Sequence, residues 1–105
     1  MKWDFLVIGA SGMQGRIATR EFLESGFSFF LADIWKGGSE TNLKRAPQKT
    51  AFDFCDVRDE NATYELIKKV GANVVLNCAE GDWNNNVYNA ALKAKANVLD
   101  LGSDI

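Results

Sequence analysis

The chain has 105 residues, of which 47% are apolar and 25% charged, with a net charge of −2. This size and balance predict a single globular domain over residues 1–105, with enough apolar surface for a real core. The small negative charge and the lack of a Lys/Arg cluster argue against nucleic acid or a membrane as partner. No apolar stretch approaches the ~20 residues that cross a bilayer. Because the first residues do not form a signal-peptide pattern, we expect a cytoplasmic protein.

The first half of the chain alternates short apolar runs with one segment of helical period. A strand is expected at Phe5–Ile8, and a helix follows it. The second strand is expected at Phe27–Ala32, closed by Asp33. Residues 35–48 contain a Gly-Gly pair and the single proline, so they predict a loop with at most one helical turn, near 42–45. The apolar residues that recur at helical spacing in the first helix are Met13, Ile17, Ala18 and Phe22.

The second half repeats the alternation. We expect a third strand at Thr50–Cys55 and a helix over Glu60–Val70, ended by a glycine. A fourth strand, Asn73–Cys78, has an apolar centre that is typical of a sheet covered on both faces. The last helix is expected over Asn84–Ala96 and a fifth strand at Val98–Leu101. The residues expected to face inward are Ala62, Leu66, Ile67 and Val70 from the earlier helix and Val87, Ala90, Ala91 and Ala94 from the later one.

Five strands that alternate with helices predict an α/β fold with right-handed crossovers. The glycines after the first strand favour a Rossmann-type doubly wound parallel sheet with strand order 3-2-1-4-5. In this topology, ligands bind at the carboxyl ends of strands one and four.

Three glycines at intervals of three follow the first strand, in the stretch Val7–Ala18, VIGASGMQGRIA. Gly9 permits the tight turn out of the strand, Gly12 has no side chain to hold a pyrophosphate away, and Gly15 lets the helix pack closely. The first N–H groups of the helix lack intrahelical partners and the dipole is positive there, so a phosphate is stabilised without a lysine. Ser11 replaces the middle glycine of GxGxxG, and its hydroxyl is a candidate phosphate ligand. The alternative is a tight turn that binds nothing.

Asp33 lies 18 positions after the last of these glycines, where the ribose of a dinucleotide would lie. A carboxylate there accepts hydrogen bonds from both ribose hydroxyls and repels a 2′-phosphate, so the sequence predicts NAD as the cofactor. The alternative role of Asp33 is to end the strand in a turn. NADP stays possible because nearby cations could bind a 2′-phosphate. These cations are Arg16, Lys36, Lys44 and Arg45.

Asp56 and Val57 follow the third strand, where this fold places the adenine. A carboxylate can accept a hydrogen bond from its amine and a valine can cover the ring. The alternative for Asp56 is to begin a turn or to cap the next helix. Cys55 and Cys78 lie in or at the end of apolar runs and are expected to be core residues. With no histidine and two cysteines, the sequence predicts no metal site, and we assign no catalytic residue.

Five short segments together resemble the N-terminal domain of saccharopine dehydrogenase/reductase-like proteins, over almost the whole chain. The resemblance implies a Rossmann domain of an NAD(P)-dependent oxidoreductase of amino-acid metabolism. It implies that the glycine turn holds the pyrophosphate, Asp33 the adenosine ribose, Asp56 and Val57 the adenine, and Cys78 and Ala79 the nicotinamide ribose region. The segments are Val7–Gly12, Leu31–Asp33, Cys55–Asp59, Val74–Ala79 and Val98–Asp104. The expected cofactor-binding residues are Gly9, Ala10, Ser11, Gly12, Met13, Gln14, Gly15, Asp33, Ile34, Asp56, Val57, Cys78 and Ala79.

One segment departs from that family pattern: Glu80–Trp83 stands where the family has small residues and a Pro-aromatic pair. The carboxylates of Glu80 and Asp82 could crowd the nicotinamide end. The alternative is that Asp82 caps the following helix and Trp83 packs on its flank.

Two function classes follow from the sequence. The first is the cofactor domain of a saccharopine-dehydrogenase-like oxidoreductase, whose substrate pocket would come from a C-terminal domain. The 105-residue chain alone is then not expected to catalyse the reaction. The second is a non-catalytic NAD(H)-sensing module, similar to the regulatory domains of potassium transporters. Strand five would leave a bare edge, which could pair with a second copy in a homodimer.

Overall fold

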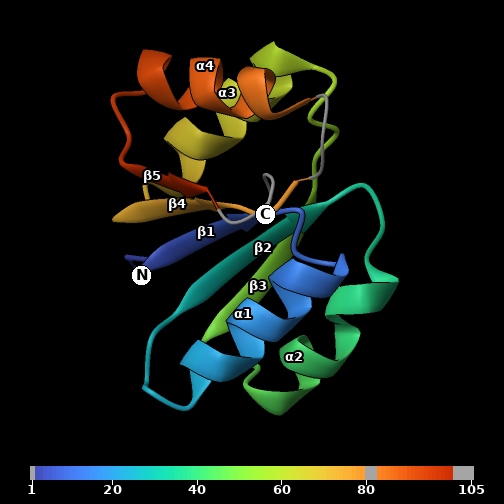
Figure 1. Ribbon diagram of the computed structural model, residues 1–105. Helices are drawn as coiled ribbons and strands as arrows, with labels where there is room; N and C mark the ends of the chain where they lie inside the picture. Colours follow the sequence, from blue (N-terminus) through green and yellow to red (C-terminus); the bar gives the residue numbers. More distant parts are fainter. Residues whose placement is uncertain (1, 80–82, 101–105) are drawn as a thin grey trace.

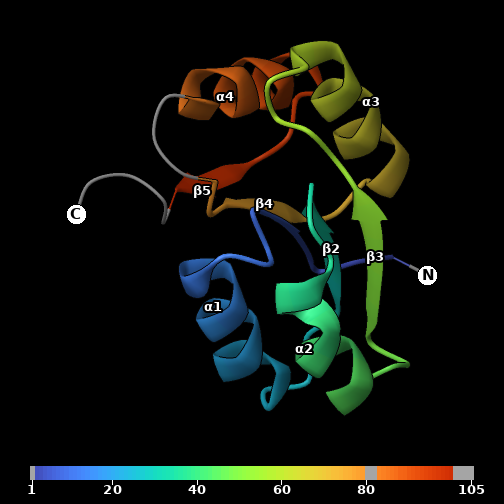
Figure 2. The same cartoon turned by 90° about the vertical axis from the view of Figure 1, so that its right-hand side faces the viewer.

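The protein forms a three-layer α/β domain, shown as a computed structural model in Figure 1. The structure describes residues 2–79 and 83–100. All five strands are parallel, in the order β3-β2-β1-β4-β5. Helices α1 and α2 cover one face of the sheet and α3 and α4 cover the other (Figures 1 and 2). The predicted Rossmann-type topology is confirmed. The elements are β1 (Phe5–Ile8), α1 (Met13–Leu23), β2 (Phe29–Asp33), the 3-10 turn η1 (Gly37–Ser39), α2 (Glu40–Arg45), β3 (Thr50–Phe54), α3 (Glu60–Val70), β4 (Val74–Asn77), α4 (Asn84–Lys93) and β5 (Val98–Asp100).

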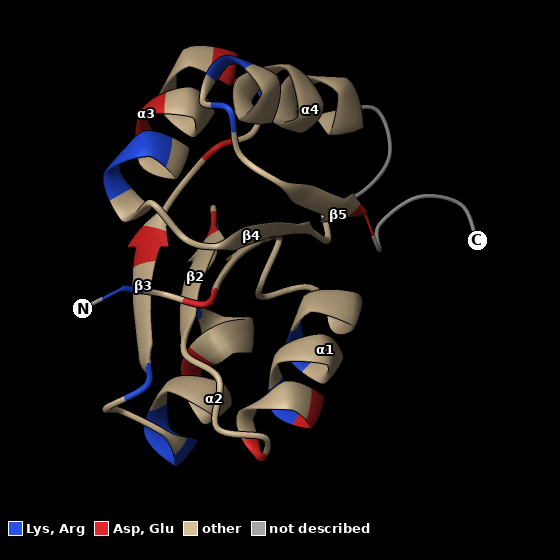
Figure 3. Ribbon diagram, turned by 90° about the vertical axis from the view of Figure 1, so that its left-hand side faces the viewer, with Lys and Arg blue, Asp and Glu red and all other residues tan. Residues whose placement is uncertain are grey.

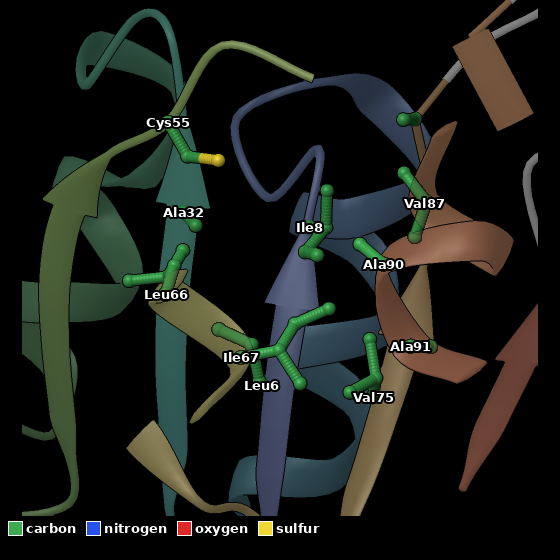
Figure 4. Packing of buried hydrophobic residues seen from close by; sticks show 11 residues of the cluster. Leu6, Ile8, Ala32, Cys55, Leu66, Ile67, Val75, Val87, Ala90 and Ala91 are labelled. Atoms are coloured by element: carbon green, nitrogen blue, oxygen red, sulfur yellow. The ribbon is translucent and has the colours of Figure 1, made fainter. Parts of the chain in front are cut away.

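The central strand β1 is buried on both sides of the sheet. Leu6, Val7 and Ile8 are at most 1% exposed, because β1 pairs with β2 on one edge and β4 on the other while helices cover both faces. Alternate residues of the strands therefore belong to two apolar clusters. Leu6 and Ile8 pack under α3 and α4 (Figure 4), and Val7 packs toward α1 and α2.

Helix α3 begins and ends at residues that suit its ends. The Asp59 carboxylate accepts a hydrogen bond from the N–H of Ala62 at 3.0 Å, and Gly71 adopts the left-handed conformation that ends the helix. Leu66 and Ile67 face the core as predicted. Ala62 was predicted to face inward, but it lies in the first turn and is exposed, and the buried position on that side is Thr63.

Helix α1 packs on the sheet through a different face from the one predicted. Met13, Ile17 and Phe22 are 66%, 45% and 43% exposed, and the buried residues are Gly15, Thr19 and Leu23. This face packs on the sheet because Gly15, which has no side chain, lets the helix backbone approach the turn at the end of β1. Phe22 still stacks on a ring at the start of β1, that of Phe5, at a centroid distance of 6.3 Å.

Several predicted boundaries shift in the structure. β2 begins at Phe29 rather than Phe27, because Ser28 is held by Asp4: its N–H donates to the carboxylate and its hydroxyl accepts from the Asp4 N–H. β3 ends one residue before Cys55, and α4 ends at Lys93, with Ala94 only partly buried. Leu101, expected in strand five, lies outside the described residues.

The segment predicted as a loop over residues 35–48 contains more helix than expected. η1 and α2 together occupy residues 37–45. Ser39 and Asn42 are buried there, at 0% and 4% exposure, and both hydrogen-bond to groups on the α1 side of the molecule. Among the described residues, no helix has the length and apolar character needed to span a membrane.

Candidate dinucleotide site

The backbones of three neighbouring strands meet at the carboxyl edge of the sheet. The N–H groups of Gly9 and Ala10 both donate to the carbonyl of Ala32, at 2.9 and 3.1 Å. The Cys78 N–H donates to the carbonyl of Ile8 at 2.7 Å. These bonds draw the turn after β1 against the ends of β2 and β4, which is the switch point of the sheet.

Gly9 and Gly15 are required by the fold of the turn itself. Gly9 has a φ of +81°, and a Cβ there would lie 2.6 Å from the backbone nitrogen of Ala79. A Cβ on Gly15 would lie 2.4 Å from the carbonyl oxygen of Gly9 and 2.7 Å from the Cα of Ala10. At both sites a side chain would therefore require the backbone to shift, before a ligand is considered.

Gly12 differs from the other two glycines, because the surrounding protein leaves room for a side chain. A Cβ there would meet only the Gly9 carbonyl oxygen, at 3.6 Å, which is an ordinary contact, and its φ of −76° suits any residue. Gly12 is the N-cap residue of α1, and no side chain caps this helix end. The first N–H groups of α1 therefore lie beside an exposed glycine, an arrangement that fits an anionic group such as a pyrophosphate.

The Asp33 carboxylate is held in a fixed orientation beside this turn. One oxygen accepts a hydrogen bond from the N–H of Ser11 at 2.9 Å, and the other accepts from the N–H of Ile34 at 2.7 Å. Each carboxylate oxygen can accept a further hydrogen bond. Asp33 is only partly buried, so both oxygens suit a pair of ribose hydroxyls, as the sequence predicts.

The predicted use of the Ser11 hydroxyl as a phosphate ligand is wrong. Ser11 is 1% exposed, and its Oγ lies 2.8 Å from the Oγ of Ser39, which is also buried. The side chain faces the interior because its N–H donates to Asp33 on one side while the hydroxyl reaches η1 on the other. Ser11 therefore supports the turn from the interior side.

Asp56 forms an ion pair within its own turn. Its carboxylate accepts hydrogen bonds from the Arg58 side chain, the shortest at 2.7 Å, and from the Arg58 N–H at 3.0 Å. These bonds lower the pKa of Asp56 to about 2. The turn alternative for Asp56 is thus the one observed, and Asp59, not Asp56, caps α3. Contact of Asp56 with an adenine stays a prediction. Val57 is partly buried against the core under α3 and α4.

Cys78 and Ala79 leave β4 directly beside Gly9. Both are buried, and the Ala79 N–H donates to the side-chain oxygen of Asn77 at 3.0 Å. Burial raises the pKa of the Cys78 thiol to about 12, with a smaller contribution from Asp100. Cys55 and Cys78 are both free and buried, as predicted. In the ranges 2–79 and 83–100, no cluster of ligating side chains could hold a metal ion. Glu80 and Asp82 lie outside the described residues.

The four cations considered for a 2′-phosphate are all exposed: Arg16 lies on α1, Lys36 directly before η1, and Lys44 and Arg45 at the end of α2. Arg45, at the end of α2, lines a shallow pocket with Arg20, Glu21 and Glu24 of α1, away from the glycine turn. In Figure 3 the basic residues are spread over several helices, not gathered at the carboxyl edge. Asp33 is therefore the charged group that the structure fixes beside the turn.

The match to a family of known proteins covers nearly the whole described chain. The family model for the NAD dependent epimerase/dehydratase family matches residues 5–100. The chain belongs to this family. The cofactor in the family's name agrees with the NAD prediction from Asp33 and the glycine turn. No curated protein matches the chain in sequence.

Solved structures with the epimerase/dehydratase-type fold resemble the chain closely in architecture. UDP-glucose-4-epimerase from Stenotrophomonas maltophila, solved with NAD and formylated UDP-arabinopyranose, matches with a TM-score of 0.78 and 16% identity over 93% of this chain and 36% of that one. WbmG from Bordetella bronchiseptica, solved with NAD and UDP, has a TM-score of 0.76 and 17% identity, covering 95% and 37%. Saccharopine dehydrogenase (L-Glu forming) from Saccharomyces cerevisiae has a TM-score of 0.76 and 17% identity, covering 96% and 22%. The chain therefore spans between 22% and 37% of the length of these proteins, and the likeness concerns the fold.

Sequence reasoning missed the polar residues that support the site from behind. Ser39 and Asn86 lie outside the recognised motifs, and Asn77 lies within one but is assigned no role by it, yet each holds a loop of the carboxyl edge. Asn86 of α4 donates to the carbonyl of Val57 at 2.9 Å, and Asn77 is fully buried at the end of β4. Isolated serines and asparagines are common on surfaces, so no local pattern marks Ser39 and Asn77 as buried or Asn86 as a partner of Val57.

Proposed function

We propose that the chain binds NAD(H) at the carboxyl edge of β1 and β2 and serves as the cofactor-binding part of an NAD-dependent oxidoreductase. One observation carries the proposal: the uncapped end of α1 at Gly12 lies beside an Asp33 carboxylate that is already fixed by two backbone N–H groups. The first suits a pyrophosphate and the second the ribose hydroxyls of the same molecule. A bound nicotinamide supplies the hydride-transfer chemistry.

The part that binds the substrate would lie elsewhere. The epimerase from Stenotrophomonas maltophila is about three times as long as the part matched here, which supports a substrate-binding part outside these 105 residues. The finer assignment, to saccharopine-dehydrogenase-like proteins, is supported by the sequence segments that resemble them and by one structural neighbour. NAD⁺-dependent oxidation of saccharopine, compared with epimerisation of UDP-glucose, would separate this assignment from an epimerase.

The direct test is calorimetric titration of the chain with NAD⁺, NADH, NADP⁺ and NADPH. We expect binding of NAD⁺ or NADH and weaker binding of the phosphorylated pair. Asp33→Asn should weaken NAD⁺ binding by about 10- to 100-fold, because hydrogen bonds to a charged group contribute about 1.5–3 kcal/mol. It should also narrow the difference between NAD⁺ and NADP⁺, since the repulsion of a 2′-phosphate is removed.

Asp53→Asn is the matched control. Asp53 is also partly buried near the end of a strand, and it accepts a hydrogen bond from the next N–H, that of Phe54, at 2.9 Å. Its other oxygen binds Lys69 of α3, away from the glycine turn. The control should leave the affinity for all four nucleotides unchanged. Equal losses in both variants, or no binding by the unaltered chain, would contradict the proposal.

A further inference from the structure

We infer that the 36–42 segment, which contains η1 and the start of α2, is a positioning element that holds the glycine turn in its binding conformation through Ser39 and Gly38. The consequence for cofactor affinity rests on the proposed NAD(H) site. The segment lies on the same face of the sheet as α1 (Figure 2) and contacts the turn across about 28 residues of sequence.

The first contact is a pair of buried hydroxyl groups. Ser11 and Ser39 are 1% and 0% exposed, and their Oγ atoms lie 2.8 Å apart. Neither hydroxyl reaches water, so each depends on the other for a hydrogen-bond partner. Removal of the Ser39 hydroxyl leaves the Ser11 hydroxyl buried and unsatisfied at the middle of the glycine turn.

The second contact brings two backbones together. A Cβ on Gly38 would lie 2.0 Å from the carbonyl oxygen of Ser11 and 2.8 Å from its carbonyl carbon. A side chain at Gly38 is therefore prevented by lack of space and not by backbone conformation, because the φ of Gly38 lies outside the positive range. The glycine allows η1 to lie directly against the Ser11 peptide group.

A third contact anchors the other end of the segment. The Asn42 side chain donates a hydrogen bond to the carbonyl of Arg16 on α1 at 3.2 Å and is 4% exposed. Between these anchors, the Ser39 N–H donates to the carbonyl of Lys36 at 2.8 Å, which closes the 3-10 turn. The segment is thus attached to both the turn and the first turns of α1.

These contacts surround one residue on three sides. The Ser11 N–H binds Asp33, its hydroxyl binds Ser39, and its carbonyl lies against Gly38. Because Ser11 binds Asp33 and lies only two residues before the first residue of α1, the segment supports both the Asp33 carboxylate and the N–H groups that begin α1. Because these groups are already ordered before binding, less conformational entropy is lost when a ligand binds.

The test compares Ser39→Ala with Ser28→Ala. Ser28 is a buried serine at the amino end of β2, the opposite end of the sheet, where its hydroxyl binds Asp4. Both variants lose a buried hydroxyl and should lose stability. Only Ser39→Ala should weaken NAD⁺ binding, on the order of tenfold, the loss seen when partners behind metal ligands are removed. Amide exchange should become faster at residues 9–12 in Ser39→Ala and stay unchanged there in Ser28→Ala.

The double variant Ser11→Ala/Ser39→Ala separates positioning from a simple loss of stability. It leaves no unsatisfied hydroxyl, so it should recover part of the stability while affinity stays as low as in Ser39→Ala. Recovery of affinity together with stability would overturn the inference. If the unaltered chain binds no nucleotide, the proposed function fails, and the inference is then decided by amide exchange: unchanged protection of residues 9–12 in Ser39→Ala overturns it, and faster exchange supports it.

Discussion

Substitution of Gly12 by alanine should separate ligand binding from folding. The space around Gly12 admits a methyl group, since the nearest atom would be 3.6 Å away and the backbone angles suit alanine. Alanine is a poorer N-cap residue than glycine, which costs roughly 0.5–1 kcal/mol. We therefore expect a loss of unfolding free energy below about 1 kcal/mol. The methyl group would project toward the uncapped end of α1, so NAD⁺ binding should be lost.

Gly15→Ala is the matched comparison, because at this position the fold itself, and not a ligand, obstructs the added methyl group. Its methyl carbon would lie 2.4 Å from the Gly9 carbonyl oxygen, where ordinary contact begins at 3.4 Å. The obstructing atoms are backbone, so the overlap should cost near the upper end of the usual 1–3 kcal/mol for overpacking. Alanine has a higher helix propensity than glycine, which offsets about 1 kcal/mol of this loss. The expected net loss is about 2 kcal/mol, at least twice that of Gly12→Ala.

Urea unfolding followed by circular dichroism measures both stabilities, and calorimetry with NAD⁺ measures binding by the folded variants. Gly12→Ala with intact stability and no binding would locate the pyrophosphate at this turn. Wild-type affinity in Gly12→Ala would refute the reasoning, because a methyl group could then be accommodated where the phosphate is placed. A stability loss equal to that of Gly15→Ala would show that Gly12 serves the fold instead.

Three further predictions concern groups outside the turn. Asp59→Ala should lower the unfolding free energy by about 1 kcal/mol, since it removes the cap of α3, and should leave NAD⁺ affinity unchanged; an unchanged urea midpoint would contradict the capping role. Arg58→Met should return the pKa of Asp56 from about 2 toward its ordinary value near 3.8, as seen by carboxyl NMR titration. Because the pKa of Asp56 is lower in the folded protein than in the unfolded chain, the Asp56–Arg58 pair stabilises the fold above about pH 4. This contribution is lost as the pH falls toward 2. The Arg58→Met variant should not show this pH-dependent loss of stability. Cys55 and Cys78, whose thiol pKa values are raised by burial, should react with a thiol reagent at pH 8 only after denaturation, and rapid reaction in the folded protein would contradict their burial.

The topology of the sheet could be predicted from sequence because its signals are local. Apolar runs such as Phe5–Ile8 fix the strands, and the glycine turn places β1 at the switch point. The packing face of α1 could not be predicted in the same way. Its apolar residues Met13 and Ile17 suggest one face, but close approach of the helix to β1 depends on the missing side chain of Gly15. Periodicity measures apolar character and takes no account of the space that a glycine leaves.

The site shows the same division between local and long-range signals. Gly9, Gly12 and Asp33 are found by spacing alone, and the structure places them together at one edge of the sheet. The partners of Ser11 could not be found, because Ser39 is distant in sequence and lies in a segment that is read as a loop. A serine hydroxyl can bind either a ligand or a buried partner, so only the surrounding packing decides which.

Helices α1 and α3, on opposite faces of the sheet, begin with different N-cap residues, and this difference bears on function. At α3 the Asp59 carboxylate accepts a hydrogen bond from the Ala62 N–H, which stabilises the helix end and places a negative charge there. At α1 the cap residue is Gly12, and the Asp33 carboxylate binds the N–H of the preceding residue, Ser11. The N–H groups that begin α1 are therefore left for another acceptor. A helix end that served only the fold would gain from a capping side chain, so the bare glycine at Gly12 favours a ligand as the missing acceptor.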